Sequence, residues 1–335
     1  MSGGERQLLR TSVARFAAEA LEPLTEALEQ GESLPPAVVD GLRALGLFQL
    51  GAAPEEIALL GVALETLADV SPAAASLVLA NAAARALLLD APSSAARARA
   101  LEAPGPLAYP LYADISEQIA DGGAWELVVG AGPASHLVLP FDESSVLIVA
   151  SEATSIRLGP LLLTLGMRGC PTKDAQLLEP AASSRVEVDV RRALARLRAP
   201  AAAICAGIVG RSLRTATDYA QSRYQAGALI IEHQEVRAML ARMLADHAAC
   251  HDAVERLASG ELPAPLARAR FIEAKERAAR ATLDGVQLLG GNGYMEAYGQ
   301  ERCLRDARQA ACCFGRLEVE RQALLGEWLE GAAGA

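Results

Sequence analysis

Apolar and polar residues follow a helical period along most of the first hundred positions. Between residues 6 and 103, apolar side chains recur at spacings of three and four, which places them on one face of successive helices. Ser33-Leu34-Pro35-Pro36 interrupts this period, and proline is favoured in the first turn of the helix that follows. Two long apolar helices are expected over residues 55–68 and 72–89. The pattern predicts an N-terminal helical domain over residues 1–104.

The period changes to that of strands after residue 105. Four short runs rich in Val, Ile and Leu occupy residues 125–129, 136–139, 145–149 and 155–158, and Gly, Pro, Asp and Ser separate them. These runs predict a small β domain over residues 105–190.

Long helices return from residue 191 to the end of the chain. Shared apolar stripes joined by short loops are typical of a helical bundle. The clearest stripe contains Val236, Met239, Leu240, Met243, Leu244, His247, Cys250, His251, Val254 and Leu257. The chain is therefore expected to have an α+β fold, with a C-terminal helical bundle over residues 191–335.

A glycine cluster interrupts this last region. An Ala-rich helical run ends near Gln287, and Gly290, Gly291 and Gly293 follow it within four positions. Glycine disfavours helix and tolerates positive φ. From the glycines alone, a helix stop with a tight turn is the favoured interpretation. A backbone that a ligand approaches closely is the alternative.

The composition of the chain limits the kinds of molecule that it is expected to bind. The chain has 335 residues, of which 52% are hydrophobic, and a formal net charge of −10. This length allows more than one core, and the negative charge argues against nucleic acid and anionic membranes as partners. No run approaches the ~20 continuous apolar residues of a membrane span, and the first residues lack the pattern of a signal peptide. The six scattered cysteines predict reduced thiols in a cytoplasmic protein.

One helical motif has the spacing of a metal pair. In His247-x-x-Cys250-His251 the two histidines lie four residues apart. No carboxylate ligand motif accompanies them, and both fall on the apolar stripe. Structural packing is therefore expected, and no metal site is predicted.

Several motifs occur in the order found in the acyl-CoA dehydrogenase family. Arg223-x-x-x-Gly227-x-x-Ile230-x-Glu232-His233-Gln234, the segment 287–294 and Arg305-Asp306-Ala307-Arg308 resemble its C-terminal domain. Gly166-Met167-Arg168-Gly169 resembles a segment of its middle domain. The resemblance implies an N-terminal helical domain, a small middle β domain, a C-terminal four-helix bundle and FAD as the cofactor.

The resemblance also implies roles for five residues. Arg223 and Gln234 match positions at the FAD of the neighbouring subunit, and Gln287, Gly290 and Gly291 match a turn that approaches the same FAD. An arginine can grip a phosphate with its planar fork. Glycines would let backbone N–H groups reach a pyrophosphate without a side-chain clash. The aromatic residue that the family carries three positions after the arginine is absent, because residue 226 is Ala.

The residues of the subunit's own active site depart from the family pattern. The family reaction needs a carboxylate base that takes the α-proton of the acyl group, while the flavin accepts a hydride. The position of that base is Phe314 in this chain, and residues 196–200, the second location used by some members, contain no carboxylate. The Gly-Ser-Asp loop and the Trp-containing strand that cover the flavin in the family are also missing.

These losses suggest a subunit that lacks its own catalytic base and completes the FAD site of a catalytic acyl-CoA dehydrogenase partner. It would resemble the short subunits of heterotetrameric, steroid side-chain acyl-CoA dehydrogenases. The substrate would be an acyl-CoA, and the electrons would leave to an electron-transfer flavoprotein. Two alternatives remain open. One is a self-sufficient dehydrogenase whose base is displaced to Glu318 or Glu320. The other is a helical pseudoenzyme scaffold that binds neither FAD nor acyl-CoA.

Overall fold

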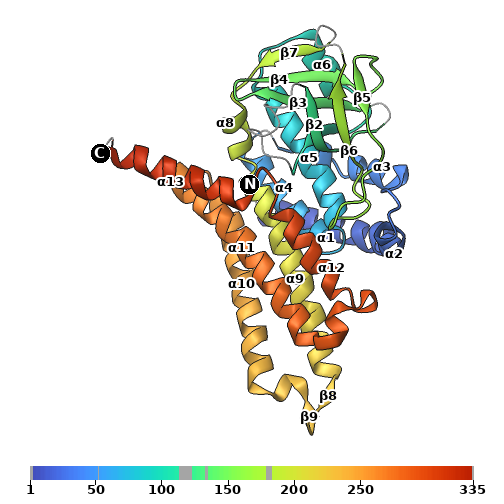
Figure 1. The fold of residues 1–335 in the computed structure, drawn as a ribbon, viewed down its shortest axis with the longest axis vertical. Coiled ribbons are helices and arrows are strands. Elements are labelled where there is room, and N and C mark those ends of the chain that lie inside the picture. The colour runs from blue at the N-terminus through green and yellow to red at the C-terminus, as the bar shows by residue number, and fades with distance from the viewer. Residues whose placement is uncertain (1–2, 52, 113–122, 133–134, 179–182, 334–335) are drawn as a thin grey trace.

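A computed structural model describes residues 3–333, except 52, 113–122, 133–134 and 179–182. The N-terminal part is helical (Figure 1). Proline opens α3, α4 and α5 in the first turn, and the Ser71 hydroxyl caps α5 by accepting from the Ala74 amide at 3.3 Å. The helices are α1 (Gly3–Phe16), α2 (Thr25–Glu29), α3 (Pro36–Ala44), α4 (Pro54–Ala68), α5 (Pro72–Asp90) and α6 (Ala95–Leu101).

The middle part is a mixed sheet of seven strands in the order β5-β6-β2-β1-β3-β4-β7. Only the β1–β3 pairing is parallel among the described strand pairs of this sheet. Both faces of the sheet are apolar, as strand β3 shows. Val138 belongs to the main core, whereas Leu137 and Leu139 belong to a second core on the opposite face of the sheet. The strands are β1 (Leu107–Pro110), β2 (Ala124–Val129), β3 (His136–Asp142), β4 (Ser145–Ala150), β5 (Ile156–Leu158), β6 (Thr172–Leu177) and β7 (Ser184–Glu187).

The C-terminal part is a bundle of long helices (Figure 1). A two-stranded hairpin, β8 (Tyr224–Gln225) with β9 (Ala228–Leu229), joins α9 to α10. Helix α13 leaves the bundle and projects from the body of the molecule. The helices are α8 (Val190–Ala195), α9 (Arg198–Ser222), α10 (Gln234–Ala258), α11 (Ala264–Leu289), α12 (Gln300–Ala310) and α13 (Leu317–Ala333).

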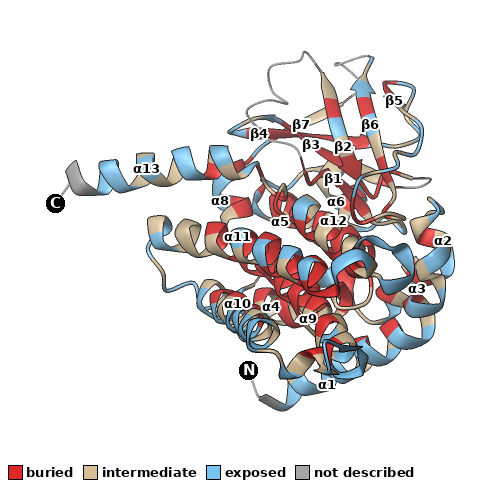
Figure 2. Ribbon diagram, turned by 60° about the horizontal axis from the view of Figure 1, so that its bottom comes forward, coloured by how far each residue is buried: buried red, intermediate tan, exposed pale blue. Residues whose placement is uncertain are grey.

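Helices α5 and α9 form the centre of the molecule (Figure 2). Helix α9 packs against α4 at close range, because a Cβ at Gly207 would lie only 2.3 Å from the Glu65 carbonyl oxygen. By length and composition alone, the stretches Pro72–Asp90 and Val190–Ser222 could each cross a membrane. In both, 89% of the apolar window is buried inside the protein, as expected for central helices of a packed core.

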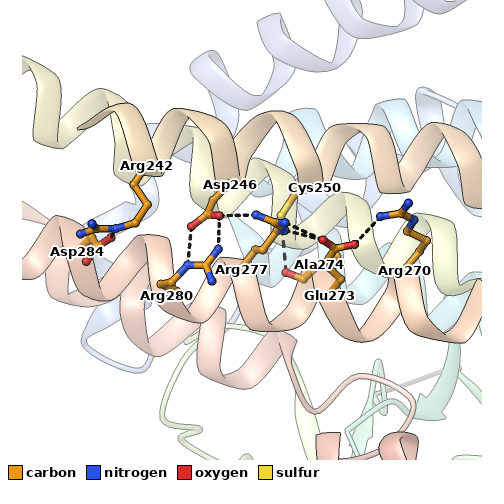
Figure 3. Close-up of polar contacts among 9 residues, drawn as sticks. All are labelled: Arg242, Asp246, Cys250, Arg270, Glu273, Ala274, Arg277, Arg280 and Asp284. Atoms are coloured by element: carbon orange, nitrogen blue, oxygen red, sulfur yellow. Dashed lines mark hydrogen bonds and ion pairs between the residues drawn. The ribbon is translucent and has the colours of Figure 1, made fainter. Parts of the chain in front are cut away.

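A ladder of charged side chains runs along the seam between α10 and α11 (Figure 3). Asp246 is only 1% exposed and accepts from Arg277 at 2.8 Å and from Arg280. Towards one end of the seam Arg242 pairs with Asp284 at 2.7 Å, and towards the other Glu273 pairs with Arg277 and Arg270. The seam is therefore held by charge pairs as well as by apolar contacts.

The structure confirms the α+β fold and most predicted elements. Helices α4 and α5 begin within one residue of their predicted starts, and the four predicted strands are present as β2, β3, β4 and β5. The apolar stripe of α10 was predicted wrongly at two positions, since Leu244 is exposed whereas Asp246 is buried. The predicted stripe ignored the pairing that lets a carboxylate enter the seam. Strands β1, β6 and β7 were not predicted.

Two tryptophans lie in opposite environments. Trp125 of β2 is 2% exposed, and its indole N–H donates to the Pro140 carbonyl oxygen at 2.7 Å. Trp328 of α13 is 60% exposed and is flanked by the exposed Leu325 and Leu329. One tryptophan belongs to the sheet core and the other to the projecting helix.

Candidate functional site

The five residues implied to contact FAD lie at one end of the helical bundle. Successive helices of the bundle run in opposite directions, so the end of α9, the start of α10 and the end of α11 meet there (Figure 1). Arg223 follows the last residue of α9, Gln234 is the first residue of α10, and Gln287 lies in the last turn of α11. Gly290 and Gly291 begin the 3₁₀ segment η6 (Gly290–Tyr294).

Polar and aromatic contacts hold the parts of this bundle end together. The Asn292 amide of η6 donates to the Tyr219 hydroxyl of α9 at 3.0 Å. The Tyr219 ring also packs edge-on against Tyr298, with centroids 5.8 Å apart. The Ile230 amide donates to the Arg223 carbonyl oxygen at 2.9 Å, which fixes the start of the α10 connection beside the end of α9. The structure therefore fixes the segments that carry the five residues relative to one another.

The surface at this end is open and polar. Arg223, Gln234 and Gln287 are exposed, and within the described part of the chain no hydrogen bond or ion pair occupies their side chains. Gly290 has φ +58° and ψ −132°, a conformation that favours glycine, and a Cβ at Gly290 or Gly291 would meet no atom within 4 Å. An unpaired guanidinium and bare glycine backbone at the same end of the bundle are features that suit a phosphate-containing group of FAD.

Phe314, the position that the resemblance assigns to the base, lies in a strained turn. Phe314 has φ +58°, which is rare for a bulky residue, and its amide donates to the Leu111 carbonyl oxygen at 2.9 Å. Its ring lies 6.4 Å from the Tyr109 ring, centroid to centroid. A phenyl group at this point can pack and exclude water, but it cannot accept a proton.

A buried lysine holds the turn that carries Phe314. Lys275 of α11 is fully buried, and its ammonium donates to the carbonyl oxygens of Cys313 at 2.8 Å and Gly315 at 3.1 Å. It also lies 4.1 Å from the centre of the Phe271 ring. Burial lowers the pKa of Lys275 below its usual value. Sequence reasoning missed this residue, although it is one of only two lysines in an arginine-rich chain.

The two alternative bases occupy different environments. Glu320 is buried and lines, with Phe314, a pocket of about 120 Å³. Its carboxylate accepts from the guanidinium of Arg268, which also pairs with Glu327 at 2.7 Å. Glu318 is exposed on α13. The pocket is small beside the ~300–1,000 Å³ typical of ligand sites, and the carboxylate that faces it is already paired.

The Arg-Asp-Ala motif supports the turn at Met167. Asp306 is buried, and its carboxylate accepts from the Met167 amide, where the backbone has φ +49°. Burial raises the pKa of Asp306 to about 7. The hydroxyls of Ser76 and Tyr112 both lie 2.9 Å from the Met167 sulfur, so a packed cluster fills the space under this turn.

One histidine of α10, His251, makes a polar contact. The ring Nδ1 of His251 lies 3.2 Å from the Glu65 carboxylate of α4, and this hydrogen bond raises the pKa of His251. His251 thus has a structural contact, as expected, but with the polar partner Glu65 across the α4–α10 contact instead of with apolar side chains. Among the described residues, no group of three or more His, Cys, Asp or Glu side chains could hold a metal ion.

Comparison with known proteins identifies the family. Residues 4–103 match the sequence profile of the acyl-CoA dehydrogenase N-terminal domain, and residues 188–328 match that of the C-terminal domain. The chain belongs to the acyl-CoA dehydrogenase family. Its fold is that of the FAD-dependent flavoproteins of this family.

Individual relatives support the same assignment. An acyl-CoA dehydrogenase of Bacillus subtilis (strain 168) is 38% identical over 129 residues, which cover 36% of this chain and 33% of that protein. The cyclohexane-1-carbonyl-CoA dehydrogenase of Geobacter metallireducens is 27% identical over 56% of this chain and 53% of that protein. The chain thus spans about a third to a half of the length of these relatives. The structure of butyryl-CoA dehydrogenase from Megasphaera elsdenii has a TM-score of 0.81 at 20% identity, covering 97% of this chain and 98% of that one.

Proposed function

We propose that this acyl-CoA dehydrogenase family member is the non-catalytic subunit of a heteromeric enzyme and completes the FAD site of a catalytic partner subunit. One observation carries the proposal. The residues matching a donated half-site are open to solvent at one end of the bundle, whereas the position of the chain's own base is a phenylalanine locked into a packed turn.

Each residue of the half-site would have a defined task. The Arg223 guanidinium would pair with a phosphate oxygen of FAD, and the Gln234 and Gln287 amides would donate or accept hydrogen bonds beside it. The bare backbone at Gly290 and Gly291 would let N–H groups approach the same phosphates. FAD, when bound, would supply the hydride chemistry of acyl-CoA α,β-desaturation, and the partner would supply the carboxylate base.

The substrate, the electron acceptor and the cellular compartment are proposed from the family resemblance. The substrate would be an acyl-CoA, with the CoA thioester of a steroid side chain as the class suggested by similarity to short heterotetramer subunits. An electron-transfer flavoprotein would take the electrons, and the cytoplasm would be the compartment. Substrate choice would depend on the partner, whose active site would hold the acyl group.

A self-sufficient dehydrogenase is the second candidate, because Glu320 lines the same pocket as Phe314. In that case the lone chain would bind FAD and act on acyl-CoA, and Glu320→Gln would abolish turnover with FAD retained. Glu318→Gln tests the other candidate base, which is exposed on α13. If neither substitution alters the activity of an active lone chain, the displaced-base candidate is wrong.

The deciding measurement is the visible flavin absorbance of the chain purified alone and together with a candidate catalytic partner. We expect a colourless lone chain and a yellow complex with one FAD for each pair of chains. Arg223→Gln should lower the FAD content of the complex about tenfold, as loss of a charge-assisted phosphate contact predicts. Arg192→Gln, an exposed arginine on α8, should not. A yellow lone chain with one FAD per subunit would overturn the proposal.

A further inference from the structure

A second pocket, of about 230 Å³, lies among the N-terminal helices. Arg43 of α3, Arg85 of α5, and Phe48 and Gln49 of the 3₁₀ segment η3 (Leu47–Gln49) contribute to its wall. The start of β1 closes another side through Leu107. None of these elements carries the half-site residues or the turn at Phe314, so the pocket is distinct from both.

Arg85 is the unusual member of this pocket. It is one of only three residues of α5 that are not buried, and the other two, Leu89 and Asp90, lie at the end of the helix. The residues on either side of Arg85 are fully buried alanines, whereas the Arg85 side chain leaves the core and lines the pocket. The Nε atom of Arg85 is buried and has no hydrogen-bond partner. Within the described chain, no ion pair neutralises the group.

The pocket has a positive charge that the lining does not balance. Among the described residues that line it, none is acidic, whereas two are arginines. Arg43 has a partner, Asp40, three residues earlier on α3, and that carboxylate is 70% exposed. Such an exposed pair is weak and leaves most of the Arg43 fork free for another anion.

The walls of the pocket are held in place by a buried amide. Asn81, one helical turn before Arg85 on α5, donates to the Phe48 carbonyl oxygen at 2.9 Å. Its side-chain oxygen accepts from the Leu107 amide at 3.0 Å. Both ends of the Asn81 amide are therefore used to tie η3 and β1 to α5. The pocket is pre-formed, and Arg85 projects from the helix that anchors it.

We infer that this pocket is a binding site for a small oxyanion, a phosphate group or a carboxylate, held by Arg85 and Arg43. The buried Nε–H of Arg85 is costly unless an acceptor meets it, and oxyanions match the fork of N–H donors of a guanidinium. The volume is enough for a phosphate or short carboxylate together with water, since a water molecule needs about 30 Å³. The exposed Gln49 amide offers a further hydrogen bond at the rim.

The test is calorimetric titration of the full chain with inorganic phosphate and, separately, with acetate, each at constant ionic strength set by sodium chloride. Saturable binding of phosphate alone would assign a phosphate group, and binding of acetate alone would assign a carboxylate. Both results support the site. Binding should weaken about tenfold or more in Arg85→Gln and in Arg43→Gln, because each loses a charge-assisted contact.

Arg99→Gln is the matched control, since Arg99 is an exposed arginine on α6 that bonds to the Ala95 carbonyl oxygen of its own helix. Its binding should equal that of the wild type. If Arg85→Gln fails to fold, Arg43→Gln on the exposed face of α3 still tests the site. Absence of saturable binding by either anion, or equal binding in all three variants, would overturn the inference.

Discussion

Phe314 and Lys275 form one structural unit at the residue scale. A bulky residue at positive φ costs about 1–3 kcal/mol and persists only where surrounding contacts fix it. Lys275 supplies those contacts by bonding the carbonyl oxygens on either side of Phe314. The turn is therefore kept in its shape although its side chain cannot act as a base.

Replacement of Lys275 tests this unit. Lys275→Met removes the hydrogen-bond donor of two buried carbonyl oxygens, which destabilises the folded state. Removal of a buried charge stabilises it and offsets part of this loss. We therefore expect the free energy of unfolding to fall by about 2 kcal/mol. Urea denaturation measures the change. Lys173→Met, at the only other lysine, should alter stability by less than about 0.5 kcal/mol. Equal effects of the two substitutions would contradict the assigned role.

Asp306 gives the stability a specific pH dependence. Because its pKa is about 7 in the folded protein and its ordinary value is 3.8, the folded state binds more protons at this residue between these values. Its stabilising contribution is complete below about pH 4 and is lost as the pH rises to 7. At about 1.4 kcal/mol per pH unit, the upper limit is about 4 kcal/mol.

Asp306→Asn isolates this contribution. The amide oxygen can still accept from the Met167 amide, but the side chain stays neutral at every pH. We therefore expect the unfolding free energy of the variant to decline less between pH 4 and pH 7 than that of the wild type. Denaturation curves over this range give the change of the unfolding free energy with pH for the wild type and the variant. An identical change in both proteins would show that Asp306 does not titrate between pH 4 and pH 7.

The seam between α10 and α11 shows how these elements are held in register. Asp246 is buried between two guanidiniums, of which Arg280 is half exposed (Figure 3). Removal of the carboxylate leaves Arg277 and Arg280 facing each other without a counter-charge. Because solvent screens Arg280, the cost should lie below the 3–5 kcal/mol typical of fully buried pairs.

We expect Asp246→Asn to lower the unfolding free energy by about 2–3 kcal/mol in urea denaturation. Asp252→Asn on the same helix is the matched control, because Asp252 forms only an exposed pair with Arg256 four residues away. That control should cost about 0.5 kcal/mol or less. If both substitutions have the same small effect, the seam does not depend on its buried charge.

The spacing of apolar residues predicted an element correctly where burial of apolar side chains alone determines its pattern. The helical period of α4 and α5 and the Val-rich strands β2 to β4 could be predicted because apolar residues there face a core. Strand β6 was missed because Lys173, Asp174 and Gln176 interrupt its apolar pattern. Asp246 was missed because periodicity counts apolar residues, whereas burial of Asp246 depends on two arginines about thirty residues away.

At the scale of the whole molecule, the five residues implied to contact FAD and the turn at Phe314 lie in different parts of the fold. The five half-site residues were assigned from motif matches, and the structure places them at one end of the bundle. The packing at Phe314 could not be predicted, because it depends on Lys275 and Leu111 from distant parts of the chain. Motif matching predicted a phenylalanine at the position of the base but not the contacts that hold its turn.

Gly291 allows the proposed role to be tested without loss of stability. A side chain there would enter open space, and its φ is not positive, so Gly291→Val should leave the melting temperature unchanged. In the complex with a catalytic partner it should lower FAD content, because the valine would stand between backbone and phosphate. Gly132→Val, also at an open glycine, is the control for flavin content. Full FAD content in Gly291→Val would place the cofactor elsewhere.

The unequal burial of the two tryptophans gives the protein two independent fluorescent reporters. In Trp125→Phe the only indole is that of Trp328, so emission should be red-shifted and acrylamide should quench it readily. In Trp328→Phe the remaining indole is enclosed by the sheet, so emission should be blue-shifted and protected until the sheet unfolds. The intensity of one variant follows the projecting helix and that of the other follows the core. Changes around helix α13 and unfolding of the sheet can therefore be observed separately without an attached dye.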